Sequence, residues 1–224
     1  MFSYYGSKYS RARYYPAPRH KLVIEPFAGS AGYSLWYRHP NRDVLLIDPD
    51  PRVVGVWRYL LGASPEEIRR LPAEVHDLDD HPHLISEARW LIGWWIAKGN
   101  ATPRRRRTRW ASRRTTGPGS CWGQRVRDRL ATQVSEIRHW RVVQGSYRDA
   151  PDAEATWFID PPYQGRVGEH YAKRFRGHAE LADWCRSRTG QVIVCEHAGA
   201  DWLPFRPLGP TGRRDYREVV WTAG

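Results

Sequence analysis

Two short apolar runs, each ended by a proline, constrain the fold of this chain most strongly. Residues 22–25 precede Pro26 and a glycine-bearing turn, and residues 44–48 precede Pro49. Such runs, bounded by turn residues, are typical of buried strands. Apolar residues then follow at helical spacing over 33–37 and 52–61. Two successive strand–turn–helix units predict an open α/β sheet.

This alternation stops in the middle of the chain. Residues 64–140 contain no convincing buried strand, and we predict helices over 84–97 and 124–137, separated by a long loop over 98–123. Sheet signals then resume. Strands are predicted over 140–143, 156–159 and 191–195, a helix over 180–187, and an antiparallel pair from 205–208 and 218–222. The prediction is one α/β domain, residues 1–63 and 141–224, interrupted by a mostly helical insertion, residues 64–140.

Composition limits the classes of function. The chain has 224 residues and a net charge of +12, which favours a polyanionic partner such as nucleic acid; the arginine usage of a GC-rich genome is the alternative explanation. No window approaches the roughly 18 apolar residues of a membrane span. The first residues also lack the apolar core of a secretory signal. We therefore expect a cytoplasmic protein, in a bacterial or phage-infected cell. Three cysteines without CxxC spacing predict neither a disulfide framework nor a metal site.

The turn after the first predicted strand has the residues of a nucleotide-type cofactor site. It reads Glu25-Pro26-Phe27-Ala28-Gly29-Ser30-Ala31-Gly32, and its glycines allow a tight turn and a close approach of backbone to ligand. Asp48 ends the next strand about 20 residues later, where a carboxylate can accept hydrogen bonds from ribose hydroxyls. A tight turn and a helix-capping acid would give the same pattern, so this pair is supportive only.

A second motif, Asp160-Pro161-Pro162-Tyr163, follows the apolar run 157–159. Two consecutive prolines fix φ at both positions and remove two N–H donors. The carbonyl of Pro161 and the carboxylate of Asp160 then form a pair of acceptors suited to a planar NH₂ group. Tyr163 supplies a ring on which a base can stack. The alternative is an ordinary turn at a strand end with a buried tyrosine.

The N-terminal segment Tyr4-Tyr5-Gly6-Ser7-Lys8 is the third element. In this order, the three motifs and the intervening insertion resemble the Dam-like, alpha-class DNA adenine N6-methyltransferases. The resemblance covers most of the chain outside residues 64–140. It implies a class I, Rossmann-like methyltransferase sheet, with S-adenosylmethionine bound at the C-terminal edge of the strands and residues 64–140 recognising the DNA target.

The resemblance also assigns roles to individual residues. It implies that five of them act on the target adenine or beside it: Asp160, Pro161, Pro162, Tyr163 and Lys8. It implies a second set around the cofactor: Tyr5, Gly6, Ser7, Phe27, Ala28, Gly29, Ser30, Asp48 and Ser146. Asp160 and the carbonyl of Pro161 would accept the two amino hydrogens, so that the nitrogen lone pair faces the methyl sulfonium. The target base would first be flipped out of the duplex.

Two positions depart from the family pattern. The usual Phe-x-Gly-x-Gly has Ala31 at its second glycine, and the glycine follows one place later at Gly32. The acidic residue that meets the cofactor adenine in many relatives is replaced here by Ser146, in Gly145-Ser146-Tyr147. A serine can still form a hydrogen bond, but cofactor affinity is left open.

Basic residues are concentrated between residues 98 and 129, where Asp128 is the single acid. We predict phosphate contacts, which give affinity but little sequence information. The predicted DNA-binding residues are Arg104, Arg105, Arg106, Arg107, Arg109, Arg113 and Arg114. Trp110 and Trp122 lie in the same stretch and could stack on bases or wedge between them. A solvated arginine-rich loop is the alternative.

Other functions remain open at this stage. Transfer to cytosine N4 in DNA or to guanine N2 in ribosomal RNA would use the same motif, and a catalytically inactive DNA-binding module would suit the arginines. Protein-glutamine methyltransferases usually have Asn at the position of Asp160, and no Asp…Glu-x-Lys constellation supports a nuclease. A monomer acting on double-stranded DNA is expected. A solitary, phage-encoded role or a restriction partner is not decided by the sequence.

Overall fold

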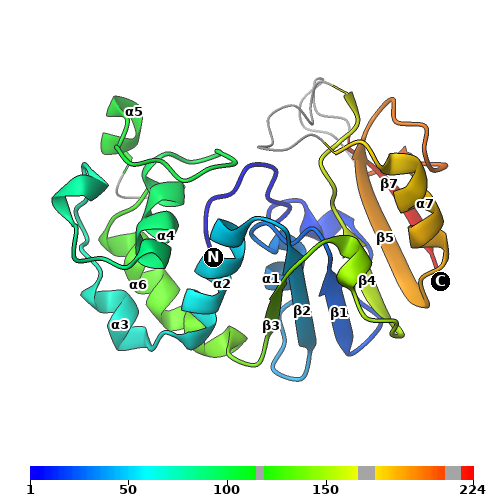
Figure 1. Ribbon diagram of the computed structural model, residues 1–224, viewed down its shortest axis with the longest axis horizontal. Helices are drawn as coiled ribbons and strands as arrows, with labels where there is room; N and C mark the ends of the chain where they lie inside the picture. The colour runs from blue at the N-terminus through cyan, green and yellow to red at the C-terminus, as the bar shows by residue number, and fades with distance from the viewer. Residues whose placement is uncertain (115–118, 166–174, 210–217) are drawn as a thin grey trace. The chain divides into compact units, whose positions relative to one another are not determined.

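The computed structural model describes residues 1–114, 119–165, 175–209 and 218–224 (Figure 1). The chain divides into two compact units. The sheet unit comprises residues 8–49 and 143–224, and the helical unit comprises residues 1–7 and 50–142. Residues 1–7 and the helix after β2 therefore belong with the helical region. That residues 64–140 form a target-recognition insertion stays a prediction.

A seven-stranded sheet has the order β3-β2-β1-β4-β5-β7-β6. The strands are β1 (Leu22–Glu25), β2 (Asp43–Asp48), β3 (Arg141–Gln144), β4 (Ala155–Ile159), β5 (Gly190–His197), β6 (Arg206–Pro207) and β7 (Glu218–Ala223). β1 pairs in parallel with β2 and β4, and β4 pairs in parallel with β5. β7 runs antiparallel to both β5 and β6. The predicted open α/β sheet is confirmed, as are the predicted strands and the antiparallel pair.

The strand order fixes where a ligand can approach the sheet. The chain passes outward from β1 to β2, and β4 then returns to the other side of β1. In open α/β sheets, ligands bind outside the carboxyl ends of the strands at this reversal. The turn after β1 and the Asp-Pro-Pro-Tyr segment after β4 both begin at this edge, because β1 and β4 are parallel neighbours.

Successive side chains of β4 pack on opposite faces of the sheet, as a strand buried on both faces requires. On one face, Trp157 and Ile159 join a core that includes Leu181 from α7 (His178–Arg186). On the other face, Phe158 stacks on Tyr33 of α1 (Gly32–Trp36), with ring centroids 4.1 Å apart. Both faces of β4 are thus covered, and this packing fixes the position of Asp160, the residue that follows the strand.

The helical unit has a core rich in tryptophan. Its helices are α2 (Pro51–Gly62), α3 (Pro65–Arg70), α4 (Ser86–Ile96), α5 (Arg109–Ser112) and α6 (Gln124–Gln133). Trp57, Trp94 and Trp122 are fully buried, and the Phe2 ring contacts both Trp57 and Trp94, with ring centroids 5.7 and 4.8 Å away. The predicted helix over 124–137 ends at Gln133 and continues as a 3-10 turn, Val134–Ile137.

The predicted loop over 98–123 contains one further helix, α5, which begins because the Thr108 side chain accepts a hydrogen bond from the N–H of Ala111. Within the described part of residues 64–140, there is no strand, as predicted. None of the described helices combines the length and apolar character needed to cross a membrane.

Candidate active site

Lys8 and Asp160 form a partly buried ion pair in the sheet unit. Nζ of Lys8 lies 2.7 Å from Oδ2 of Asp160, and the lysine side chain is 4% exposed. The other carboxylate oxygen, Oδ1, is buried and has no hydrogen-bond partner among the described residues. A buried acceptor without a donor costs about 1–3 kcal/mol, so native proteins keep few of them. This oxygen marks a position where a donor group can bind.

The electrostatics of Asp160 follow from its burial. Loss of water raises the pKa of this carboxyl to about 6, and the nearby ammonium of Lys8 limits the rise. The negative charges of Glu218 and Glu196 raise the pKa further. Asp160 is therefore a stronger base than an exposed aspartate and is still ionised at neutral pH.

Glu218, the first residue of β7, connects this pair to its surroundings. Its carboxylate accepts hydrogen bonds from the hydroxyls of Tyr163, at 3.2 Å, and Tyr15, at 3.1 Å. Arg11 and Lys8 lie 3.4 and 3.7 Å from it. Sequence analysis missed Glu218 and Tyr15. The available signal was a glutamate that opens an otherwise apolar strand.

Tyr163 is held by this network rather than projecting into solvent. It is 8% exposed, and its ring centroid lies 4.9 Å from Nζ of Lys8. Burial raises the pKa of the Tyr163 phenol well above its usual value, so the hydroxyl stays a donor to Glu218. Because the Lys8 ammonium covers one face of the ring, the predicted stacking of a base can use at most the opposite face in this conformation.

Side chains of α7 and β5 form hydrogen bonds to the segment that follows Asp160. Nε2 of His178 lies 3.1 Å from the carbonyl oxygen of Pro162. The buried carboxylate of Glu196 accepts a hydrogen bond from the N–H of Gln164 and another, at 2.9 Å, from the indole of Trp202. Sequence analysis did not identify His178 or Glu196. Their contacts hold the two prolines in one orientation, which the predicted role of the Pro161 carbonyl requires.

The predicted ribose acid and glycine turn are in direct contact. Oδ2 of Asp48 accepts a hydrogen bond of 2.9 Å from the N–H of Gly29, which has a φ of +46°. The N–H of Ala28 donates to the carbonyl of Ile47, so the turn after β1 is tied to the end of β2. Ser30 is buried beside them. The structure thus brings Asp48 and the glycine turn together, and their role in cofactor binding stays a prediction.

The displaced glycine has a structural explanation. A Cβ on Gly32 would lie 2.4 Å from the backbone N of Tyr9 and 2.8 Å from that of Lys8, so only glycine fits where this segment crosses α1. Ala31, at the family's usual glycine position, adopts a left-handed φ of +48°. The turn therefore keeps the backbone conformation that a glycine would favour, while the glycine itself provides room for the segment bearing Lys8.

Ser146 is engaged in local structure. Its side chain accepts a hydrogen bond from the N–H of Arg148, and its own N–H donates to Oδ2 of Asp149, at 2.7 Å, in a capping box. Phe27 stacks on Tyr147 of the same turn, with ring centroids 5.7 Å apart. Asp149, which sequence analysis did not consider, places a carboxylate on the turn where relatives of the resembled family have their acid.

Three predicted cofactor residues, Tyr5, Gly6 and Ser7, belong to the helical unit. The N–H of Tyr5 donates to the carbonyl of Asn100, at 3.2 Å, and Gly6 has a φ of +75°. Their role in cofactor binding stays a prediction.

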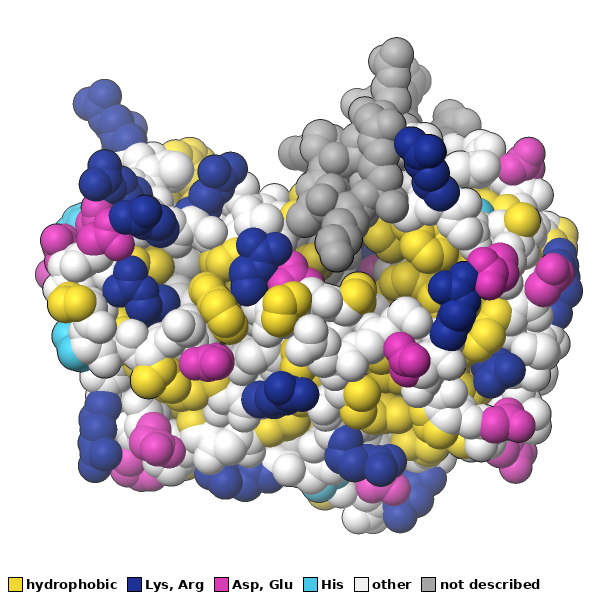
Figure 2. Space-filling view, in the orientation of Figure 1, with side chains coloured by type: hydrophobic (Ala, Val, Ile, Leu, Met, Phe, Trp, Pro, Cys, Tyr) yellow, Lys and Arg dark blue, Asp and Glu magenta, His cyan; other side chains and the backbone are white. Residues whose placement is uncertain are grey.

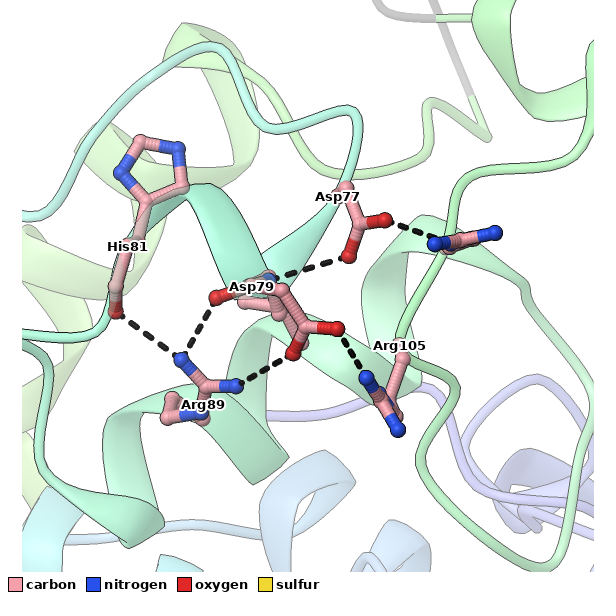
Figure 3. A network of polar contacts seen from close by, with 7 residues as sticks. Asp77, Asp79, His81, Arg89 and Arg105 are labelled. Atoms are coloured by element: carbon pink, nitrogen blue, oxygen red, sulfur yellow. Dashed lines mark hydrogen bonds and ion pairs between the residues drawn. The ribbon is translucent and has the colours of Figure 1, made fainter.

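The predicted DNA-binding arginines fall into two groups within the helical unit. Residues 104–107 form a segment we call the strap, which is bonded to both of its neighbours. The N–H of Arg104 donates to Gly93 of α4, and the N–H of Arg107 donates to His76. Arg105 pairs with Asp79 and Arg106 with Asp77, while Arg89 also reaches Asp79, at 3.1 Å (Figure 3). The guanidinium of Arg107 donates to the carbonyl of Trp122.

The second group lies on and after α5. Arg109, Arg113 and Arg114 are exposed, and the Arg114 guanidinium lies 4.6 Å from the ring centroid of Trp110. The suggestion that Trp122 stacks on bases is wrong, because this residue is fully buried and its indole donates to the carbonyl of Pro72.

Comparison with known proteins adds little to this geometry. No protein-family model and no curated protein matches the sequence. Among solved structures, the chain is similar to "Putative methyltransferase yhhF from Escherichia coli", with 12% identity and a TM-score of 0.38. The match covers 90% of this chain and 74% of that one. A likeness at this level does not bear on activity or substrate.

Proposed function

We propose that this chain transfers a methyl group from S-adenosylmethionine to N6 of adenine in double-stranded DNA. The observation that supports this best is the Asp160 carboxylate. One oxygen binds Lys8, and the other is buried without a donor among the described residues, directly before two prolines at the sheet reversal. An exocyclic amino group supplies the N–H donor that this oxygen lacks.

The cofactor is expected at the turn after β1. The hydrogen bond between Asp48 and Gly29 brings a carboxylate and a glycine turn together, as binding of a ribose beside closely approaching backbone requires. Phe27, Gly29 and Asp48 would hold the nucleoside part of the cofactor. When bound, the cofactor would supply an activated methyl group on a sulfonium.

The residues of the chain would then orient and activate the amino nitrogen. Oδ1 of Asp160 and the carbonyl of Pro161 accept its two hydrogens, so the lone pair is directed away from them. The Asp160 carboxylate would take the proton that the nitrogen loses on accepting the methyl group, which the cofactor would supply with its thioether as the leaving group. Lys8 keeps that carboxylate ionised at neutral pH by opposing the effect of burial. Positioning provides most of the acceleration.

DNA binding is expected through the arginines of the helical unit, with the target base flipped out of the duplex at a cost of a few kcal/mol. The excess of positive charge on the chain, +12, supports a polyanionic substrate. A catalytically inactive DNA-binding module would need no buried acceptor at Asp160, so we rank it second. Calorimetric titration with S-adenosylmethionine distinguishes the two, because the inactive module would bind none.

The decisive experiment uses unmethylated duplex DNA and S-adenosylmethionine with a deuterated methyl group. After digestion to nucleosides, mass spectrometry should find labelled N6-methyldeoxyadenosine with the native protein and none with Asp160→Ala or Asp160→Asn. The matched control is Asp183→Asn, which removes a carboxylate that is 83% exposed on α7. Label in N4-methyldeoxycytidine or in RNA would change the substrate that we propose but leave the proposed methyl-transfer chemistry in place. Unchanged labelling by Asp160→Ala would refute the assignment.

A further inference from the structure

Trp110 is the most exposed of the twelve tryptophans in this chain. Its side chain is 52% exposed, whereas the tryptophans of the helical core are buried. Exposing an indole forgoes the stabilisation that burial of a large apolar side chain provides. Its position is nevertheless well defined by the short helix α5, since Ala111 is fully buried and anchors the helix. Trp110 thus presents an aromatic ring at the surface of the helical unit.

Three arginines lie near Trp110 in the sequence, and one of them contacts its ring. Arg109 lies in α5, Arg113 is its C-terminal cap, and the guanidinium of Arg114 lies 4.6 Å from the Trp110 ring centroid. The N–H groups of Arg113 and Arg114 donate to Trp110 and Ala111, and the carbonyl of Arg114 accepts from Cys121. Figure 2 shows Lys and Arg side chains projecting in the region where Figure 1 places α5. We call Arg109, Trp110, Arg113 and Arg114 the tip.

The charges of the tip differ from those of the strap. Arg105 and Arg106 are paired with Asp79 and Asp77, so two of the strap charges are neutralised within the helical unit. For Arg109 and Arg113, the described residues include no ion-pair partner. The tip thus offers an aromatic ring with uncompensated guanidinium groups, whereas the strap is a structural clamp between α4 and residues 76–79.

We infer that the tip is the element that engages the DNA duplex, with Trp110 stacking on or wedging between bases and its arginines binding the adjacent phosphates. Stacking on a base uses the π-face of an indole, and wedge residues in DNA-binding proteins are large and apolar. Guanidinium groups bind phosphate oxygens in two-pronged geometry. An apolar protein partner would not match the three cations. The inference rests on the proposed DNA substrate and names the surface that binds it.

The test measures binding of a short, mixed-sequence duplex by fluorescence anisotropy at fixed salt. Trp110→Ala should weaken binding about tenfold, as expected for loss of one stacked aromatic side chain. Trp110→Phe should retain most of the affinity because it keeps an aromatic face. The matched control is Trp36→Ala, which removes the other exposed tryptophan, 40% exposed, from the sheet unit and should leave affinity unchanged. Circular dichroism should show that all three variants keep the native fold.

Several results would overturn the inference. Native affinity in Trp110→Ala, an equal loss in Trp36→Ala, or tighter binding of RNA than of duplex DNA would each exclude it. The same native protein is also tested for DNA methylation. If Trp110→Ala loses binding and the native protein does not methylate DNA, DNA binding by the tip would be supported and the proposed reaction refuted. If the native protein methylates DNA and Trp110→Ala binds DNA with unchanged affinity, only DNA binding by the tip would be refuted.

Discussion

Nζ of Lys8 lies 2.7 Å from Oδ2 of Asp160, although 152 positions separate the two residues in the sequence. The contact leaves the second carboxylate oxygen without a donor among the described residues. Lys8 thus acts on one oxygen of the carboxylate and leaves the other to a ligand.

Replacing Lys8 by Gln should raise the pKa of Asp160 above its value of about 6, because the ammonium that opposes the effect of burial is lost. If the ionised carboxylate is the active form, as the proposed function requires, methyl transfer should then need a higher pH. The titration is followed by the ¹³C shift of the Asp160 carboxyl, which does not depend on activity. Lys21→Gln, which removes an exposed ammonium beside Asp43, is the control. An unchanged or lowered pKa in Lys8→Gln would show that Lys8 does not set the charge of Asp160.

Glu218→Gln should move the same pKa in the opposite direction. The negative charge of Glu218 raises the pKa of Asp160, so its removal should lower it, while the amide oxygen can still accept from Tyr163. Glu218→Ala should also reduce the free energy of unfolding by about 1–3 kcal/mol, because two buried hydroxyls lose their acceptor. Urea denaturation measures this effect, with Glu180→Gln on the surface of α7 as the control. A Glu218→Ala protein as stable as the native one would contradict the network described above.

Glu25 should make stability depend on pH. Burial raises its pKa from 4.5 to about 8, while its carboxylate accepts from the N–H of Ser34. Between these two pH values, the folded protein holds a proton that the unfolded chain has lost. The free energy of unfolding should therefore fall as pH rises, by at most about 1.4 kcal/mol per pH unit from this group, and stop falling above about pH 8.

Glu25→Gln should remove this slope, because the amide cannot ionise and its oxygen can still accept from Ser34. Chemical denaturation across the pH range measures the difference between variant and native protein. That difference should grow as pH rises and then level off. Glu66→Gln, at an exposed position on α3, should leave the native slope in place. A difference that stays constant between about pH 4.5 and pH 8 would mean that Glu25 is ionised in the folded protein throughout this range.

Gly32→Ala should disrupt the approach of the Lys8 segment to α1. The added Cβ would lie 2.4–2.9 Å from backbone atoms of Lys8 and Tyr9, which cannot move independently of the segment. We expect a loss of about 1–3 kcal/mol of stability together with loss of methyl transfer. Gly62→Ala is the matched control, because a Cβ there meets nothing within 4 Å and alanine favours a helix. Equal stability of both variants would argue against the close contact at Gly32.

Arg113→Gln and Arg105→Gln remove the same charge from different surroundings. If the tip binds phosphate, Arg113→Gln should reduce the slope of log K against log salt by about one. Arg105→Gln should change this slope little, because its guanidinium pairs with Asp79 in the free protein. Anisotropy titrations at several salt concentrations measure both. Equal reductions in the two variants would show that strap and tip contact DNA alike.

The sequence alone predicted the parts of the fold that depend on local pattern. Apolar runs and prolines located β1 and β2 to within one residue, because burial on both faces leaves a continuous apolar signal. The order of motifs also selected Asp160, Lys8 and Asp48 as candidate site residues, and their roles stay predictions. Glu218 and His178 could not be found in this way, since their contacts join residues that only tertiary folding brings together. The pairing of Arg105 with Asp79, 26 positions apart, escaped prediction for the same reason.

The antiparallel strand β7 has a consequence for the order of folding. Glu218 contacts Tyr15 and Arg11 across 203 and 207 positions, which are among the longest chain closures possible here. Contacts at such separation stabilise the chain only after the entropic cost of closing a long loop has been met, so they form late. A chain whose parallel strands have paired but whose last strand has not docked would hold a nearly complete sheet without the contacts of Glu218. If the chain transfers a methyl group as proposed, its turnover would report that folding has reached the final step, which a measurement of secondary structure would not reveal.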